Sequence, residues 1–152
     1  MKITTREATD ADATIIADFN ASMAKETENI ELNRERLRQG VEALIADSTK
    51  GKYYLAEADG KVVGQLLLTY EWSDWRNATF WWIQSVYVHP KYRHQGIFRS
   101  LYRTIETIAL KNGDICGLRL YVEKTNQRAQ QTYESLGMKF SHYQMMDIDI
   151  TV

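Results

Sequence analysis

The segment that most constrains the fold is a run of apolar and aromatic residues followed by a proline. Phe80–Val88 reads FWWIQSVYV, and Pro90 stands just beyond it. A run of this kind is typical of a strand buried on both faces of a sheet, and proline ends such a strand because it has no N–H to donate. From Phe98 to Ala109, apolar residues then recur at helical spacing. The sequence therefore predicts a central strand, a short turn and a helix.

Local patterns predict strands and helices in the rest of the chain. Thr9, Asn33 and Asn126 each precede a stretch with helical spacing, and their side chains can cap its first amides. Asn112–Gly113 and Gly137 are expected to end helices in the left-handed conformation. The further predicted strands are Lys2–Arg6, Tyr53–Ala58, Lys61–Tyr70, Leu118–Val122 and Lys139–Ile150.

The connections complete the predicted element order. Asp59–Gly60 lies between two apolar runs and is typical of a hairpin, because both turn positions need positive φ. Glu71–Asn77, EWSDWRN, is expected to be a loop. The resulting order is strand–helix–helix–strand–strand–strand–helix–strand–helix–strand. This order predicts a mixed α/β (α+β) fold, in which helices flank a mixed central sheet whose first half is antiparallel.

Composition is typical of a single globular domain. Of 152 residues, 44% are hydrophobic and 26% charged, with no linker-like stretch, so we expect one domain over residues 1–152. The single cysteine, Cys116, excludes an intrachain disulfide and favours a cytoplasmic protein. No apolar run approaches the roughly 20 residues that span a bilayer. The net charge is −1, without a Lys/Arg-rich run. Neither a membrane nor a nucleic acid is therefore an expected partner.

The turn between the central strand and the following helix has the features of a phosphate-binding site. Helix N-termini carry free N–H groups and a partial positive charge, and Gly96 would let the backbone approach an anion closely. Arg93, His94 and Arg99 add donors around the turn. From these residues alone, a plain strand-to-helix turn with a glycine required only for geometry is an equally good interpretation.

Two motifs resemble those of the GNAT (Gcn5-related N-acetyltransferase) family. Arg93–Phe98, RHQGIF, is similar to the family's acetyl-CoA motif Arg/Gln-x-x-Gly-x-Gly/Ala, with Phe98 in place of a small residue. Asn126–Ala129, NQRA, and Tyr133–Met138, YESLGM, resemble the family's N-x-x-A and Y-E-x-L-G-F segments. The order of elements also fits this family over the whole chain.

The resemblance implies where acetyl-CoA, the expected cosubstrate, binds. In the family, the strand before the turn and the strand after the next helix splay apart, and the pantetheine arm lies between them. This implies backbone contacts of the arm with Val86, Tyr87 and Val88. It also places Asn126 near the arm, although this residue is equally well interpreted as a helix cap. The motif implies a pyrophosphate site made of Arg93, His94, Gln95, Gly96, Ile97, Phe98 and Arg99. No metal is expected, since the histidines lack the spacing of metal ligands.

Acetyl transfer to an amine needs a neutral nucleophile, a polarised thioester carbonyl and a proton for the leaving thiolate. The resemblance implies that a backbone N–H of Ile83–Val88 polarises the carbonyl. It also implies that Tyr133, which would contact the coenzyme, is the acid. A tyrosine pKa of about 10 suits an alkyl thiolate. Without the resemblance, Tyr133 would be interpreted as a core aromatic. The general base stays open among Glu71, Asp74, Glu123 and a water molecule.

The acceptor site is expected in the part of the chain that does not bind acetyl-CoA. Acidic residues in Glu26–Glu31 and Glu71–Asn77, with the tryptophans of the second segment, could hold a cationic amine by charge and cation–π contact. A loop anchored by its tryptophans, or a subunit contact, explains these residues equally well. The candidate acceptor-binding residues are Glu28, Glu71, Trp72, Trp75 and Gln84.

We therefore expect an acetyl-CoA-dependent N-acetyltransferase that acts on the primary amine of a small molecule by direct attack in a ternary complex. Two alternatives stay open: acetylation of a protein or peptide, and a CoA-binding regulatory module without catalysis. Because homodimers are common in the family, the resemblance also implies a homodimer.

Overall fold

The computed structural model describes residues 1–151. The chain divides into two compact units, Met1–Leu120 and Tyr121–Val152. The first unit holds the sheet and the helices α1, α2 and α3, and the second holds α4 (Gln127–Ser135). That residues 1–152 form a single domain stays a prediction.

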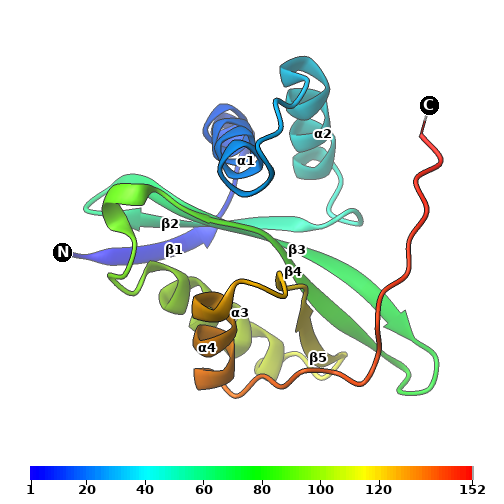
Figure 1. Ribbon diagram of the computed structural model, residues 1–152. Coiled ribbons are helices and arrows are strands. Elements are labelled where there is room, and N and C mark those ends of the chain that lie inside the picture. The colour runs from blue at the N-terminus through cyan, green and yellow to red at the C-terminus, as the bar shows by residue number, and fades with distance from the viewer. Residues whose placement is uncertain (152) are drawn as a thin grey trace. The chain divides into compact units, whose positions relative to one another are not determined.

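The first unit is built on one mixed sheet of five strands (Figure 1). The strands β1 to β4 pair antiparallel, whereas β5 pairs with β4 in parallel. This arrangement confirms the predicted mixed sheet with an antiparallel first half. In chain order, which is also their order in the sheet, the strands are β1 (Ile3–Glu7), β2 (Lys52–Ala58), β3 (Lys61–Ser73), β4 (Ala78–Val88) and β5 (Ile115–Leu120).

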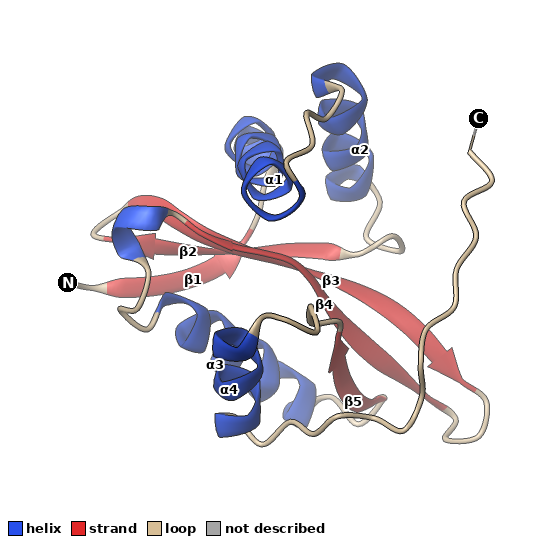
Figure 2. Cartoon of the chain, in the orientation of Figure 1, coloured by secondary structure: helices blue, strands red, loops and turns tan. Residues whose placement is uncertain are grey.

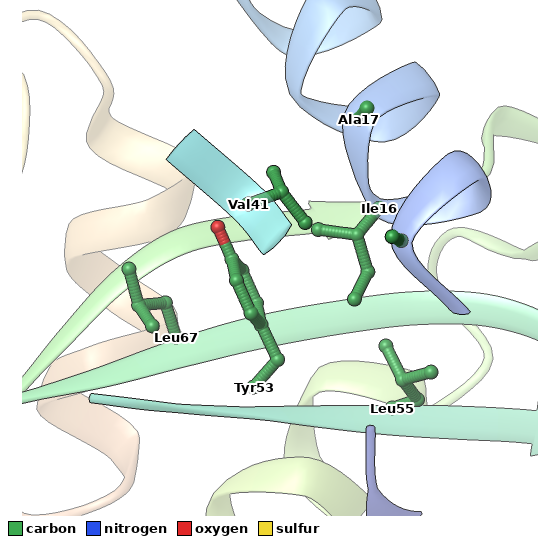
Figure 3. Packing of buried hydrophobic residues seen from close by; sticks show 7 residues of the cluster. Ile16, Ala17, Val41, Tyr53, Leu55 and Leu67 are labelled. Atoms are coloured by element: carbon green, nitrogen blue, oxygen red, sulfur yellow. The ribbon is translucent and has the colours of Figure 1, made fainter. Parts of the chain in front are cut away.

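Helices cover both faces of this sheet, as Figure 2 shows. The helices α1 (Ala13–Glu28) and α2 (Arg34–Ala46) lie on one face, called the α1 face below, and α3 (Ile97–Lys111) lies on the other. Among the described helices, none is long and apolar enough to cross a membrane. Buried side chains join α1 and α2 to β2 and β3. Those labelled in Figure 3 are Ile16, Ala17, Val41, Tyr53, Leu55 and Leu67.

The predicted helix caps are confirmed by hydrogen bonds. The side chains of Asn33 and Asn126 accept backbone N–H bonds at the starts of α2 and α4, at 2.9 and 3.1 Å. The N–H of Thr9 donates to the Asp12 carboxylate at 2.7 Å, and the two residues form a capping box before α1. Such bonds satisfy amides that a helix leaves without partners. Their short range explains why the sequence alone could predict them.

Of the predicted left-handed turns, two are confirmed and one is wrong. Asp59 and Gly60 have φ values of 50° and 85° in the β2–β3 hairpin, and Gly137 has a φ of 97° after α4. The Asn112–Gly113 prediction is wrong, because Asn112 is extended with a φ of −100° at the end of α3. Its side chain instead accepts a hydrogen bond from the Asp114 N–H at 3.0 Å. The asparagine therefore closes this turn with its side chain and not with a left-handed backbone.

Two strand predictions differ from the structure because strands require partners. The strand β5 runs over Ile115–Leu120, not Leu118–Val122, since Thr79–Ile83 of β4 provides its hydrogen-bonding edge. The predicted final strand, Lys139–Ile150, is wrong: no strand follows β5 in residues 121–151. Apolar side chains of this C-terminal segment are 61–94% exposed. The predicted element order is therefore correct only as far as α4.

The predicted loop Glu71–Asn77 is also shorter in the structure. The strand β3 continues to Ser73, so Glu71 and Trp72 belong to it, and the turn is confined to Asp74–Asn77. Successive side chains of a strand point to opposite faces of its sheet. Glu71 and Trp72 therefore lie on opposite sides of β3, a separation that the loop interpretation missed.

Candidate functional site

The turn between β4 and α3 has a backbone that can receive an anion. After Val88, a single 3-10 turn spans Pro90–Tyr92, and α3 begins at Ile97. His94 and Gly96 are both left-handed, with φ values of 63° and 84°. A Cβ atom at Gly96 would have no neighbour within 4 Å, and Gly96, as the N-cap of α3, has no side chain with which to cap it. Backbone that alternates between right- and left-handed residues forms N–H-lined concavities that bind anions.

The first residue of α3 packs tightly on β3. Ile97 is only 2% exposed. A Cβ atom added to Gly64 of β3 would lie 2.8 Å from the Ile97 Cγ2 atom and 3.3 Å from the Tyr87 carbonyl oxygen. The absence of a side chain at Gly64 therefore allows the N-terminus of α3 to approach the sheet at the end of β4.

Arg93 ties the turn to β4 and to α1. Its Nε atom donates to the Val88 carbonyl at 2.8 Å, and its terminal NH2 group contacts both Glu26 carboxylate oxygens, at 3.2 and 3.0 Å. The guanidinium carbon lies 5.3 Å from the centre of the Tyr87 ring. The side chain that the motif assigned to the pyrophosphate site thus also fixes the turn in place. Its effect on phosphate binding stays a prediction.

The C-terminal part of β4 pairs along one edge. Its parallel pairing with β5 ends at Ile83 and Leu120, where β5 itself ends. The pairs between β4 and β3 continue to Val88. In the described part of the chain, Gln84–Val88 therefore has no β5 partner. Val86, Tyr87 and Val88, the predicted pantetheine contacts, lie in this stretch.

A bulge changes the direction of the side chains in this stretch. Two residues of β4, Ser85 and Val86, lie opposite Leu66 of β3, where the register shifts. Ser85 has a φ of 50°, a conformation that costs a non-glycine residue about 1–2 kcal/mol. A one-residue insertion turns the following side chains to the other face. Tyr87 therefore lies on the α1 face, with its ring 5.2 Å from that of Phe19.

Several polar and aromatic side chains meet on the α1 face beside the bulge. Glu71 accepts one hydrogen bond from the Trp82 indole at 2.8 Å and one from Arg119 at 3.0 Å. The guanidinium carbon of Arg119 lies 3.5 Å from the centre of the Phe80 ring. Trp82 and Gln84 are two residues apart on β4 and so share this face. These five residues are called the Glu71 surface below.

The other predicted acceptor residues lie elsewhere in the first unit. Trp72 is on the opposite side of β3 from Glu71 and is 61% exposed, and Trp75 in the hairpin turn is 88% exposed. Neither tryptophan therefore anchors the segment to the core. Glu28 is the last residue of α1. Figure 1 shows the α1–α2 connection well apart from the tip of the β3–β4 hairpin, so the structure does not join these two predicted halves of the acceptor site.

Two predicted site residues belong to the second unit. Tyr133 is half-buried on α4, and burial raises the pKa of its hydroxyl above the usual value. The hydroxyl therefore carries its proton at neutral pH, as an ordinary tyrosine does. The interpretation of Asn126 as a helix cap is confirmed, and its role near the coenzyme stays a prediction.

Sequence reasoning missed Arg119 and Gln65, and it assigned Glu26 to the predicted acceptor segment and not to an ion pair with Arg93. Glu26 and Arg119 form ion pairs with partners far away in sequence, for which no local signal exists. Gln65 is fully buried, and its amide bonds to Asn20 and to Ser85. The signal for Gln65 was a lone polar residue in the apolar core of β3. Within residues 1–151, no three His, Cys, Asp or Glu side chains are grouped as metal ligands.

Comparisons with known proteins agree with this architecture. The model of the "Acetyltransferase (GNAT) family" matches residues 16–138. A thialysine N-epsilon-acetyltransferase from Bos taurus is 36% identical over 77 residues, which are 50% of this chain and 44% of that protein. The chain thus spans less than half the length of this relative.

Solved structures share the whole fold. A possible acetyltransferase from Clostridium difficile 630 is 49% identical, with a TM-score of 0.92 and coverage of 100% of both chains. A ribosomal-protein-alanine N-acetyltransferase from Brucella melitensis biovar Abortus 2308 has a TM-score of 0.80 at 18% identity, over 99% of this chain and 100% of that one. This second likeness concerns the fold alone.

The matched residues include both motifs and the whole sheet from β2 to β5. The mixed sheet with helices on both faces agrees with the expected fold, and the 49% identical structure extends the match over the full chain. The recognition made from the two motifs is thereby confirmed. This chain belongs to the acetyltransferase (GNAT) family.

Proposed function

We propose that this chain is a cytoplasmic, acetyl-CoA-dependent N-acetyltransferase that transfers an acetyl group to the primary amine of a small molecule. One juxtaposition supports this most. A helix N-terminus whose N-cap is the left-handed Gly96 follows, after one short turn, a stretch of β4 that has no β5 partner in the described chain. The helix N-terminus suits phosphates. The open edge of β4 offers backbone groups to the amides of a pantetheine arm.

The residues of the turn fit a pyrophosphate. Left-handed His94 and Gly96 suit an N–H-lined concavity, and the open space beside Gly96 suits an approaching anion. The ring of Phe98 lies 6.2 Å from that of Tyr102 on the same helix. The backbone N–H of Phe98 is the group that we propose for the ligand. The proposed acetyl-CoA contacts are Val86, Tyr87, Val88, Arg93, His94, Gln95, Gly96, Ile97, Phe98, Arg99, Asn126 and Tyr133.

When bound, acetyl-CoA supplies the activated thioester, and the chain supplies three further functions. A backbone N–H at the β4 bulge polarises the carbonyl as charge develops on its oxygen. The Tyr133 hydroxyl, which carries its proton at neutral pH, donates it to the departing sulfur. The attacking nitrogen loses one proton, for which Glu71, Asp74, Glu123 and a water molecule are the candidate acceptors, and this proton balances the one that Tyr133 gives up. The Glu71 surface holds the amine. Each oxygen of Glu71 accepts one hydrogen bond, from Trp82 or Arg119, so the amine would use the remaining lone pairs of a carboxylate that these two partners hold in place.

A small-molecule acceptor is favoured over a peptide by one comparison. The name of the bovine relative gives the Nε of thialysine, a small cationic amine, as its acceptor. The Glu71 surface combines a carboxylate, an amide and two aromatic rings beside the bulge, with the Arg119 guanidinium bound to the carboxylate and stacked on Phe80. Those groups suit an amine of this kind by charge and cation–π contact.

The proposal is tested by ligand binding and turnover. Coenzyme A at 100 times its Kd stabilises a protein by about 2.7 kcal/mol through mass action, which calorimetry and thermal unfolding both detect. Turnover is then measured with polyamines, lysine analogues and N-terminal peptides. Binding with transfer only to peptides would favour the protein acetyltransferase, and binding without any transfer would favour a regulatory module. No binding at millimolar CoA would refute the assignment.

The acceptor part of the proposal has a separate test. Glu71→Gln should raise the KM for a cationic amine several-fold while the KM for acetyl-CoA stays unchanged. Glu28→Gln tests the other predicted segment, and Glu42→Gln on the exposed side of α2 is the control. Equal KM values in Glu71→Gln and wild type would show that the Glu71 surface does not bind the acceptor.

We also propose that the chain forms a homodimer in which a second copy covers the C-terminal segment. This segment, residues 139–151, alternates apolar and polar side chains from Asp147 to Thr151, as a strand does. Met146, Ile148 and Ile150 are almost fully exposed. Ile148→Asp should therefore convert a dimer to a monomer in light-scattering measurements, whereas Asp147→Asn should not. A wild-type monomer would refute this proposal.

A further inference from the structure

Gln65 is a polar side chain sealed inside the first unit. It is 0% exposed. Its Nε2 group donates two hydrogen bonds, one to the Asn20 side-chain oxygen on α1 at 2.8 Å and one to the Ser85 carbonyl in the β4 bulge at 3.1 Å. Asn20 in turn donates to the Tyr53 hydroxyl at 3.4 Å. A buried chain of polar groups thus leads from β2 through α1 and β3 to the bulge.

Stability alone does not explain this glutamine. Within residues 1–151, its Oε1 atom is a buried acceptor without a hydrogen-bond partner, and such an atom costs free energy that methionine or leucine would avoid. The bulge carries a second cost, because Ser85 is left-handed without being glycine. Costs of this kind are concentrated at functional sites, where the surrounding structure maintains them.

The bond to Ser85 determines the direction of a neighbouring amide. The Ser85 carbonyl and the Val86 N–H belong to the same peptide unit, which is planar and trans. The two groups therefore point in opposite directions. Holding the carbonyl toward Gln65 aims the Val86 N–H away from it, in the stretch of β4 that has no β5 partner.

We infer that Gln65 is a positioning residue for acetyl transfer: it holds the Ser85 carbonyl and thereby aims the Val86 N–H at the thioester carbonyl. The inference rests on the proposed function. Asn20 fixes the amide of Gln65 from the other side, so that the amide cannot rotate away from the bulge. Gln65 does not touch the substrate and acts through the backbone.

The test compares transfer with binding in Gln65→Met, which keeps the length of the side chain and removes its donor. The single-turnover rate of acetyl transfer should fall at least tenfold, while the Kd for CoA, which lacks the acetyl group, stays within about twofold. Tyr53→Phe is the matched control, because it alters the far end of the chain of polar groups and leaves the Gln65–Ser85 bond intact. Parallel losses of rate, CoA affinity and thermal stability in Gln65→Met would indicate a purely structural role and overturn the inference.

Rescue at Ser85 provides a second criterion. Glycine adopts a left-handed φ without strain, so Ser85→Gly should maintain the bulge when its hydrogen bond is lost. The single-turnover rate of the double variant Gln65→Met/Ser85→Gly should be at least threefold higher than that of Gln65→Met. No recovery would contradict a role through the bulge. If Gln65→Met does not fold, Gln65→Leu is measured in its place, with the same expectations.

A spectroscopic measurement separates this inference from the proposed function. The amide NMR signal of Val86 in the wild type should differ between the CoA and acetyl-CoA complexes, and Gln65→Met should reduce that difference. If no amine is acetylated, the proposed function fails, yet this signal still tests whether Gln65 aims the amide. An unchanged difference in Gln65→Met would overturn the inference.

Discussion

Replacing Gly64 by alanine should weaken both the fold and CoA binding, because one methyl group would push on the first residue of α3. The new Cβ atom would lie 2.8 Å from the Ile97 Cγ2 atom, whereas carbon atoms in optimal contact are about 3.5–4.0 Å apart. Ile97 or the strand must therefore move by roughly 1 Å. Overpacking of this kind costs about 1–3 kcal/mol. The entropy that alanine removes from the unfolded chain offsets about 0.4–1 kcal/mol of this.

The expected net loss is up to about 2.6 kcal/mol, with a central value of about 1.3 kcal/mol, which lowers the Tm of a chain of this size by about 3–5 °C. Because α3 begins at the displaced residue, the Kd for CoA should rise by about tenfold. Both quantities are measured by calorimetry. Gly113→Ala is the control, since a Cβ atom there has no neighbour within 4 Å.

A double variant tests the proposed cause of this loss. Leucine lacks the Cγ2 branch of isoleucine, so Ile97→Leu removes the atom that the new methyl group meets. Gly64→Ala and Ile97→Leu should therefore be less destabilising together than the sum of the single changes, by at least about 0.5 kcal/mol. If Gly64→Ala keeps wild-type stability and CoA affinity, then the contact between Gly64 and Ile97 does not position the turn, and the reasoning fails.

Three further changes test other parts of the structure. Gly96→Val should abolish most of the thermal shift with CoA, because a β-branched residue does not tolerate a φ of 84°; an unchanged shift would place the phosphates elsewhere. Tyr133→Phe should slow single-turnover transfer by roughly 10²–10⁴-fold with little change in CoA affinity, and an unchanged rate would leave this tyrosine as a core aromatic. Asp12→Asn should destabilise the protein at neutral pH, because Arg6 lowers the pKa of Asp12. A group whose pKa is lower in the folded state stabilises the protein at pH values above its unfolded pKa, and this contribution is lost as the pH falls through the folded pKa. In chemical denaturation, the free energies of unfolding of wild type and variant should therefore converge in acid.

What the sequence could predict depended on how local each signal was. The caps at Asn33 and Asn126 and the hairpin at Asp59 involve hydrogen bonds or backbone angles within a few residues, and all three were correct. The final strand over Lys139–Ile150 failed because its alternating pattern describes a strand that needs a partner, and the described chain supplies none. A pattern reports the preference of a segment and not the presence of its neighbour.

The candidate site was likewise predictable only where its signal was local in the sequence. The turn around Gly96 lies between β4 and α3, where the motif placed it, whereas the left-handed conformation of His94 and Gly96 was not predicted. The acceptor region required knowledge of strand faces: Glu71 and Trp72 are adjacent in sequence but lie on opposite sides of β3. Gln65 was not predicted, because its importance depends on a bulge in another strand, which no local pattern indicates.

The position of β1 in the sheet has a consequence for the order of folding. Its partner β2 lies beyond α1 and α2, with pairs that run from Ile3↔Ala58 to Glu7↔Tyr54. The β2–β3 hairpin closes through a two-residue turn and can form within about 1–10 μs, whereas β1 must first close a long loop at an entropic cost. The amides of β1 should therefore gain protection after those of β2 and β3 during refolding. During synthesis on the ribosome, β1 emerges before β2 and must wait for the chain of β2 before it can pair.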